Sequence, residues 1–224
     1  MKRKWKLWMI AFVVFVMTDI MMQSNRAEAK KRTFTVSSKT IPCSSSYRQK
    51  PYYNKKTKQY YMINSYMRRL STTGGTLKLK KGTYKIPGTI YVPSNVKIVC
   101  ANGVKIKKTK ATGTKKVKST KFLFQMISEE KASGKQNTGK YAASKNASIQ
   151  GNGKVIFDMG NVNGATAVFV GHASGITVSG VRFRNKKGGS YIWIEGSKNI
   201  SVRQCVFERK KDCLLYTSPS PRHT

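Results

Sequence analysis

The sequence predicts an all-β protein whose short strands wind into a coiled stack, a β-solenoid. Two observations carry this prediction. From about residue 76 apolar and polar residues alternate in short runs bounded by Gly, Pro, Asn or Ser, and two ten-residue segments repeat at a constant offset. Alternation is typical of strands with one buried face, and a repeat of about 20–50 residues is typical of a stacked array.

The first 29 residues have the pattern of a secretory signal peptide. A basic start, MKRKWK, precedes the apolar run LWMIAFVVFVM, and Ala27-Glu28-Ala29 supplies an A-x-A cleavage site. The apolar run is too short to cross about 30 Å of hydrocarbon. We therefore expect cleavage, no membrane span in the mature chain, and a protein that is secreted or held at the cell surface; retention of the segment as an anchor is the alternative.

Residues 30–57 are basic, contain tyrosine, show no clear period and are interpreted as a lead-in to the coil. The coil itself is assigned to residues 58–212, and we expect a short amphipathic helix at its start. Gly74-Gly75 would end that helix, because glycine tolerates the left-handed conformation. Apolar residues recur at helical spacing at Tyr60, Ile63, Met67 and Leu70.

Strands follow one another quickly after this helix. TLKLKKGTYKI (Thr76–Ile86) alternates and turns at Gly82, and IYVP, NVKIVC and VKI follow it. Residues 107–145 interrupt the alternation with lysine-rich segments around FLFQMI (Phe122–Ile127). This interruption predicts a buried strand between two basic loops.

The repeat sets the expected register of the later coils. SGITVSGVRF (Ser174–Phe183) and KNISVRQCVF (Lys198–Phe207) superpose at an offset of 24 residues. Parallel strands lie about 4.8 Å apart, so this offset stacks Phe183 on Phe207 inside the coil and places Arg184 beside Glu208 outside it. The other expected pairs are Ile176 with Ile200, Val178 with Val202, and Val181 with Cys205; further back, Ile149 precedes Ile176 by 27 residues and Ile98 precedes Ile149 by 51, interpreted as two periods.

The cysteines predict no metal site. Cys43, Cys100 and Cys205 are odd in number and lack C-x-x-C spacing, which leaves a structural thiol or one disulfide. Cys100 and Cys205 are expected about four coils, or about 19 Å, apart, whereas the Cα atoms of a disulfide lie about 4.4–6.8 Å apart. Those two cysteines are therefore not expected to pair.

The formal charge of +36 predicts attraction to polyanions. Acidic polysaccharide, wall polymer, anionic lipid and nucleic acid are the candidate partners. Lysine outnumbers arginine, which suits diffuse attraction better than bidentate recognition of bases, so we expect no specific nucleic-acid partner. A solvated basic face without a partner is the alternative.

His172 and Glu195 are the candidate catalytic residues. The 24-residue offset aligns Gly171 with Glu195, so His172 and Glu195 fall in equivalent turns of adjacent coils. A histidine beside a carboxylate is able to act as an acid/base pair, and a structural hydrogen bond between the two turns is the alternative.

Tyr191 and Trp193 are the candidate substrate-binding residues. In the run YIWI, matching Ile192 with Val168 and Ile194 with Val170 directs the isoleucines inward and the two aromatic residues outward. An exposed aromatic face suits the apolar face of a pyranose ring, so these residues would form a sugar-stacking platform beside Glu195.

The motif YMINSYMRRLSTTGGTLKLKKGTYKI resembles the start of the pectate-lyase-like superfamily of right-handed parallel β-helices, and the coils SGITVSGVRFRN and SKNISVRQCVFE resemble its later turns. The resemblance covers roughly Tyr60 to Lys211. The chain is similar in particular to bacterial secreted β-helix proteins that contain the segment G-H-F-I-E-x-x-x-S-K-N. At the corresponding positions this chain has Ser190 in place of the His and Trp193 in place of the Glu.

The resemblance implies a right-handed parallel β-helix with a short N-terminal capping helix. The superfamily includes pectate lyases, polygalacturonases and non-catalytic surface proteins. Calcium is implied only by the resemblance to its lyases, and the residues themselves indicate no cofactor. We therefore expect a secreted protein that binds or acts on polysaccharide, as a lyase or glycoside hydrolase. A non-catalytic surface or adhesin-type protein that binds glycan or wall polymer is the alternative.

The last twelve residues, CLLYTSPSPRHT (213–224), lack the lysine and the alternation of the rest. They match the in-frame translation of a sequencing adaptor. On this interpretation the native sequence stops near Asp212, further coils follow it in the natural protein, and the 224-residue chain tends to aggregate because its last coil is uncapped.

Overall fold

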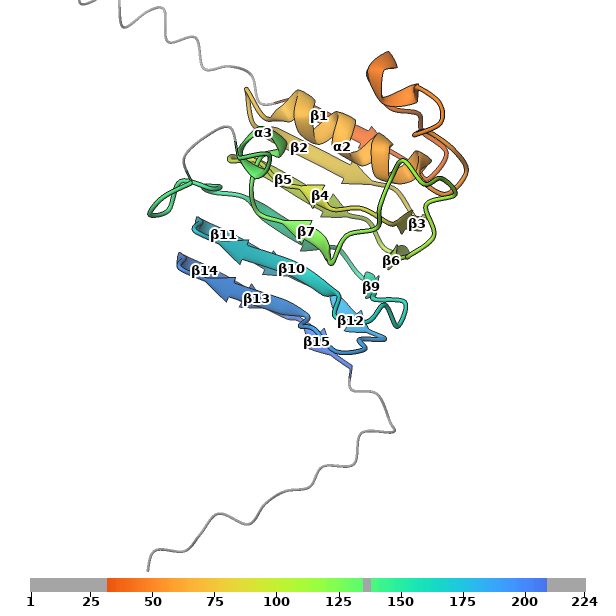
Figure 1. Cartoon of the computed structure of the whole chain (residues 1–224). Coiled ribbons are helices and arrows are strands. Elements are labelled where there is room, and N and C mark those ends of the chain that lie inside the picture. The colour runs from red at the N-terminus through yellow and green to blue at the C-terminus, as the bar shows by residue number, and fades with distance from the viewer. Residues whose placement is uncertain (1–31, 135–137, 209–224) are drawn as a thin grey trace, which may run out of the picture. The chain divides into compact units, whose positions relative to one another are not determined.

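The computed structural model describes residues 32–134 and 138–208, which form a parallel β-helix (Figure 1). The predicted signal peptide and the predicted adaptor tail lie outside these residues. Three parallel sheets, named sheets A, B and C, run along the stack. The fold class predicted from alternation and repeat is thus confirmed.

Each coil visits the three sheets in the order A, B, C, and every strand pairs with the equivalent strands of the coils beside it. Sheet A has the order β1-β2-β5-β8-β11-β14, sheet B β3-β6-β9-β12-β15 and sheet C β4-β7-β10-β13. The strands of sheet A are β1 (Arg32–Val36), β2 (Gly75–Leu79), β5 (Val96–Cys100), β8 (Ser148–Gly151), β11 (Ser174–Ser179) and β14 (Lys198–Arg203). Those of sheet B are β3 (Gly82–Ile86), β6 (Val104–Lys108), β9 (Ile156–Asp158), β12 (Arg182–Arg184) and β15 (Val206–Phe207). Those of sheet C are β4 (Ile90–Tyr91), β7 (Phe122–Gln125), β10 (Thr166–Gly171) and β13 (Ile192–Glu195).

The 24-residue register is confirmed between the last two coils, where Ile176 pairs with Ile200 and Phe183 with Phe207. The alignment of Ile149 with Ile176 is wrong, because Ile149 pairs with Val178. The 51-residue offset is correct, since Ile98 pairs with Ile149. It corresponds to a single coil, not to two periods, because β5 and β8 are direct neighbours and the residues between them leave the coil.

The interior of the coil is mostly apolar and contains a ladder of phenylalanines. Phe124 stacks on Phe157 at 5.2 Å between ring centroids, Phe157 meets Phe183 edge-on at 5.5 Å, and Phe183 stacks on Phe207 at 5.2 Å. Phe157 and Phe183 are fully buried. The predicted stacking of Phe183 on Phe207 is confirmed.

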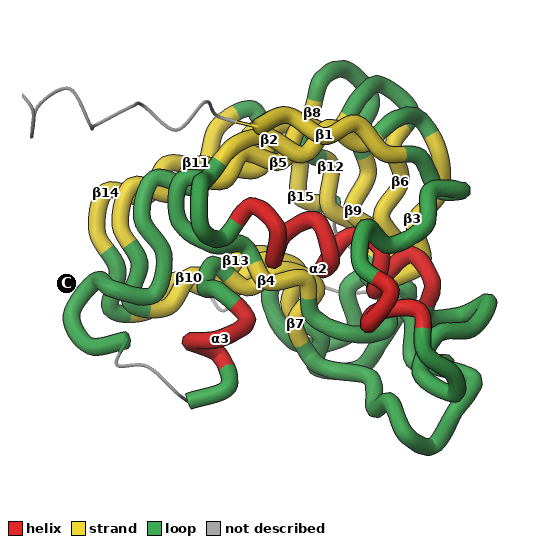
Figure 2. The backbone as a smooth tube through the Cα atoms, turned by 90° about the horizontal axis from the view of Figure 1, so that it is seen from above, coloured by secondary structure: helices red, strands yellow, loops and turns green. Residues whose placement is uncertain are grey.

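Helix α2 (Lys58–Leu70) lies across the first coil, as the view from above shows (Figure 2). It spans the predicted helix and buries its apolar face over the end of the core. The lead-in also contributes β1, which sequence periodicity missed and which pairs in parallel with β2, and a short 3-10 helix, η1 (Ser45–Arg48). The buried residues of α2 are Met62, Ile63, Asn64, Ser65, Met67 and Leu70.

Two side-chain amides of α2 cap the first strands of sheets B and C. Asn64 donates from Nδ2 to the carbonyl of Thr89 (3.0 Å) and accepts from the backbone N–H of Tyr91 (3.2 Å). Gln59 likewise donates to the carbonyl of Thr83 (3.2 Å) and accepts from the N–H of Lys85 (2.6 Å). Each amide bonds to residues two apart on one strand, as a residue of a neighbouring parallel strand would. Together with β1 on sheet A, they satisfy the strand edges at this end of the coil.

The insertion contains the predicted strand, β7, and a short helix, α3 (Glu129–Ala132). The first two lysines of the insertion do not lie in a basic loop as predicted, because Lys107 and Lys108 belong to β6. Alternation along β6 turns Lys108 inward, where it is fully buried. Its ammonium donates to the carbonyls of Pro87, Gly88 and Phe122 at 2.8–3.0 Å and to the Thr120 hydroxyl at 3.3 Å.

The cysteines of the described residues are all free thiols. The expectation that Cys100 and Cys205 do not pair is therefore met, although β5 and β14 are three coils apart in sheet A, not four. The difference follows from the insertion, which lengthens one coil without adding another.

Candidate functional site

The outer face of sheet C carries a row of large side chains. Trp193 pairs in register with Phe169, Phe169 with Gln125, and Gln125 with Tyr91. These residues alternate with the inward Val168 and so point away from the core. Four strands at about 4.8 Å spacing make this row about 14 Å long. We call Tyr91, Gln125, Phe169 and Trp193 the sheet C row.

The aromatic end of the row is rigidly packed. Phe169 stacks on Phe122 with 4.7 Å between centroids, and Trp193 meets Phe169 edge-on at 5.2 Å and Phe122 at 6.3 Å. The Phe169 ring lies over Gly171, where an added Cβ would stand 2.7 Å from the ring. Glycine at this position therefore allows the ring to lie flat. Trp193 stays 47% exposed at the end of this cluster, with its outward direction as predicted.

Tyr191 does not share the outward face with Trp193, which corrects the predicted pair. Its ring packs against Phe183 (5.7 Å) and Phe207 (5.9 Å), and its hydroxyl donates to the carbonyl of Glu208 at 2.6 Å. The physical reason is that Tyr191 precedes β13, so the pleat of the strand does not set its direction. Burial raises the pKa of Tyr191.

The turns of His172 and Glu195 are adjacent, as the repeat predicts. Gly171 pairs with Glu195 in register, and the backbone N–H of His172 donates to the carbonyl of Glu195 at 3.0 Å. The residue directly opposite His172 is Gly196, and an added Cβ there would lie 3.0 Å from the imidazole Cε1. The structure thus places the imidazole over Gly196, at the corner from sheet C to sheet A.

The imidazole also holds the insertion loop. Nδ1 of His172 lies 3.2 Å from the carbonyl oxygen of Lys140. A carbonyl only accepts, so the neutral tautomer has its proton on Nδ1 and Nε2 is the basic nitrogen. Close by, the Lys198 ammonium lies 4.6 Å from the centre of the Tyr141 ring, a cation–π contact. Glu195 is exposed and lies two residues beyond Trp193 on the outward face of β13, which is about 7 Å along a strand.

A second polar cluster lies beyond the Tyr91 end of the row and was not singled out from the sequence. The Tyr47 hydroxyl donates to the Glu129 carboxylate at 2.8 Å, and Arg68 lies 3.8 Å from Glu130. Burial, followed by the hydrogen bond to Glu129, raises the pKa of Tyr47 to about 12. Arg68, Glu129, Glu130 and Tyr91 help to line a recess of about 10 Å³, which has room for about one water molecule. This cluster fastens η1 and α3 to α2.

The outer face of sheet B is basic and is organised by one buried carboxylate. Asp158 lies 3.0 Å from the Lys105 ammonium and 3.6 Å from Nε of Arg184, and it accepts from Asn185 and from the N–H of Gly160, both at 2.9 Å. Burial opposes ionisation of Asp158, but the hydrogen bonds and the Lys105 charge outweigh it and lower the carboxyl pKa.

The predicted pair of Arg184 with Glu208 is therefore not formed, because Asp158 engages Arg184. Glu208 instead pairs with Arg182 at 2.8 Å. Both side chains of this pair are substantially exposed.

Metal binding finds no support in the residues that the structure describes. No three His, Cys, Asp or Glu side chains come together there as a metal site requires. The carboxylates do not fit the oxygen-rich shell that calcium prefers, so no step is assigned to calcium. Within the same residues, no helix is long and apolar enough to cross a membrane.

Two members of the aromatic cluster were missed from the sequence. Phe169 precedes Trp193 by 24 residues, so the repeat itself contained the signal for it. Phe122 gave no comparable signal, because the insertion separates it from any regular offset.

Comparisons with known proteins give likenesses to solved structures alone. No protein-family model and no curated protein matches this chain. One similar structure is the surface adhesin PfbA of Streptococcus pneumoniae, with 16% identity over 66% of this chain and a TM-score of 0.47. Another is a family GH82 iota-carrageenase from A. fortis, with 20% identity over 68% of this chain and a TM-score of 0.45. The chain aligns with only 34% and 40% of the length of these two proteins. The assignment of a β-helix therefore rests on the strand order of this chain itself.

Proposed function

We propose that this protein is secreted or displayed at the cell surface and binds an acidic polysaccharide along the outer face of sheet C. The observation that carries the proposal is the half-exposed Trp193, held in place by Phe169 and Phe122 at the end of the sheet C row. An aromatic ring that is already ordered loses little entropy when the apolar face of a sugar stacks on it.

The charge of the chain supports an acidic glycan over a neutral one. The formal net charge is +36, and lysine-rich segments flank β7 in the insertion. Such a field raises the rate at which a polyanion meets the protein, and the effect weakens as salt rises because the Debye length shortens. The aromatic row would then fix the sugar that the charge attracts.

Replacing Trp193 tests this proposal. We expect Trp193→Ala to weaken binding of polygalacturonate about tenfold or more, which is the scale of a buried aromatic anchor. Calorimetric titration at fixed salt measures the effect. Phe207→Ala is the matched control, because Phe207 is also an aromatic residue on the last strand of its sheet, with a similar exposure of 50%, but belongs to the interior ladder. Equal affinity of the two variants for the glycan would rule out the Trp193 platform.

Catalysis on such a glycan is the second candidate function, favoured by the adjacency of His172 and Glu195. Here Nε2 of His172 would serve as the base and Glu195 as the acid, beside a sugar held by Trp193. We expect turnover to fall at least 100-fold in His172→Ala if this is correct. Reducing-end and 235 nm absorbance assays on a panel of acidic glycans measure hydrolysis and elimination separately, and binding without turnover in the unaltered chain would exclude this second function.

A further inference from the structure

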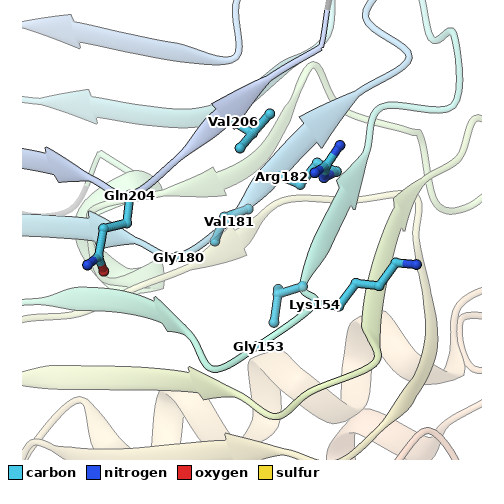
Figure 3. Close-up of a pocket in the computed structure, with 8 residues that line it drawn as sticks. Gly153, Lys154, Gly180, Val181, Arg182, Gln204 and Val206 are labelled. Atoms are coloured by element: carbon cyan, nitrogen blue, oxygen red, sulfur yellow. The ribbon is translucent and has the colours of Figure 1, made fainter.

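The corner between sheets A and B carries a hollow of about 340 Å³ that lies apart from the sheet C row (Figure 3). Its volume is in the range of small-molecule sites, about 300–1,000 Å³. Three successive coils contribute to it. Its lining residues are Gly153, Lys154, Val155, Gly180, Val181, Arg182, Gln204 and Val206.

Glycine lets successive coils pack closely at this corner. The carbonyl of Gly151 lies 2.3 Å from where a Cβ on Gly180 would stand, so the two coils approach more closely here than side chains would permit. Gly180 also has a φ of +68°, which favours glycine. Beside this close contact, the buried Val155 and Val181 form the apolar floor of the hollow.

Cations and an amide surround that floor. Lys154 and Arg182 come from neighbouring coils and lie on the sheet B side of the hollow, whereas Gln204 lies on the sheet A side (Figure 3). Among the residues that the structure describes, no ion pair involves Lys154. Arg182 is paired with Glu208, but their side chains are 50% and 36% exposed. A pair of this kind contributes about 0–1 kcal/mol, so another anion is able to displace the carboxylate.

We propose that this hollow binds an oxyanion carried on a sugar ring, either the carboxylate of a uronic acid or a sulfate ester. Arg182 and Lys154 bind the oxyanion, Gln204 bonds to ring hydroxyls, and the valines contact the apolar face of the ring. Glu208 competes with the ligand for Arg182. This inference rests on the proposed binding of acidic glycan and adds a second contact, on another sheet, that selects for charge.

Methyl NMR of the full chain tests the site directly, because Val155, Val181 and Val206 place reporter groups in its wall. Digalacturonate, a sulfated galactose disaccharide and neutral lactose are titrated in turn. We expect shifts of these methyl signals with the two acidic sugars and not with lactose, and the stronger of the two identifies carboxylate or sulfate as the preferred oxyanion. Equal shifts with lactose, or none with either acidic sugar at saturation, would overturn the proposal.

Charge variants separate a built site from general attraction. We expect Arg182→Gln to weaken binding of the preferred acidic sugar at these methyls about tenfold, since a charge-assisted hydrogen bond is lost. Glu208→Gln should strengthen it about threefold by removing the competitor. Lys85→Gln is the matched control, since Lys85 lies three strands from Arg182 in sheet B and two residues further along the strand, about 16 Å away, and should change affinity less than twofold. Equal losses in Arg182→Gln and Lys85→Gln would show that only diffuse charge acts.

Tryptophan fluorescence keeps this proposal distinct from the proposed function. Trp193 is the only tryptophan within residues 32–208, so the signal that Trp193→Phe removes reports on sheet C. Quenching of that signal without valine shifts would refute the corner site alone. Valine shifts without quenching would refute the sheet C platform alone.

Discussion

The two ends of the described coil differ in whether their inward-facing positions are covered. At the first coil, α2 covers the apolar interior, β1 pairs with sheet A, and the amides of Gln59 and Asn64 satisfy sheets B and C. At the last described coil the inward positions are open: Phe207 is 50% exposed and Val202 38%, whereas Phe183 and Val178, one coil earlier, are fully buried. The comparison teaches that coverage by a neighbouring coil, more than the residue type, decides how much an inward side chain contributes to stability.

Among truncations of a side chain, the largest expected effect comes from the phenylalanine ladder. Phe183→Ala should lower the free energy of unfolding by about 3–5 kcal/mol, because it removes a fully buried ring that contacts Phe157 and Phe207. Phe207→Ala, at the same position one coil later, should cost about 1 kcal/mol because half of its ring is already in water. Urea denaturation measures both. Losses of equal size would mean that Phe207 is covered in solution and that the two ends do not differ in this way.

The amide cap of sheet C should come next. Asn64→Leu keeps the approximate volume of the side chain but leaves the carbonyl of Thr89 and the N–H of Tyr91 without their partner. Because each unsatisfied buried group costs about 1–3 kcal/mol, we expect a loss of about 2–4 kcal/mol. Gln59→Leu, whose amide bonds to Thr83 and Lys85 are exposed, should cost less than half of this.

Thermal unfolding of the two variants provides the measurement. A smaller loss in Asn64→Leu than in Gln59→Leu would contradict the view that the buried amide replaces a missing strand.

Particular residues show how far sequence predicted this molecule. The pairs Ile176 with Ile200 and Phe183 with Phe207 were correct because strict alternation and a constant repeat leave one register that buries every apolar residue. The pairing of Ile149 was wrong because turn lengths vary between coils, and no local pattern reports a turn that is two residues longer.

The candidate site was predicted in part for the same reason. Trp193 lies within β13, where the pleat sets its direction, and it faces outward as expected. Tyr191 lies just before that strand and packs against the ladder instead. Contacts across the insertion, such as Phe122 with Phe169, depend on a tertiary path that the repeat does not encode.

Lys108 differs from the apolar inward residues at both ends of the coil, because it places an ionisable amine inside the coil. Burial lowers the pKa of its ammonium from the ordinary 10.5 to about 7. Between these two values the unfolded chain binds more protons than the folded one, so stability should rise as pH rises from about 7 towards 10. It should fall again as pH returns to about 7 and level off below that, where both states hold the proton. The slope is up to about 1.4 kcal/mol for each pH unit.

Lys108→Met isolates this contribution. We expect the variant to be less stable than the unaltered chain, because the carbonyl of Gly88 loses its donor and the carbonyls of Pro87 and Phe122 each lose one of theirs. We also expect it to lack the rise in stability with pH. Urea unfolding between pH 7 and about 9.5 suits the comparison, since the buried tyrosines, with pKa values such as about 12 for Tyr84, begin to act in the opposite direction above about pH 10. Parallel pH profiles for the two proteins would show that the buried amine does not titrate in this window.

The smallest effect on stability should come from a substitution at the open end of the coil. There, an effect on self-association can be measured without a large effect on folding. Val202 occupies the same inward position as Val178, yet it is partly exposed and β14 is the last strand of sheet A. Val202→Lys should change the free energy of unfolding by about 0.5 kcal/mol or less, as at other surface sites, whereas Val178→Lys should prevent folding because it buries an unpaired charge. An exposed apolar strand edge promotes edge-to-edge pairing, and a lysine on such an edge opposes it. Sedimentation velocity should therefore show less self-association in Val202→Lys than in the unaltered chain, and a strong loss of stability in this variant would mean that the open end is covered in solution.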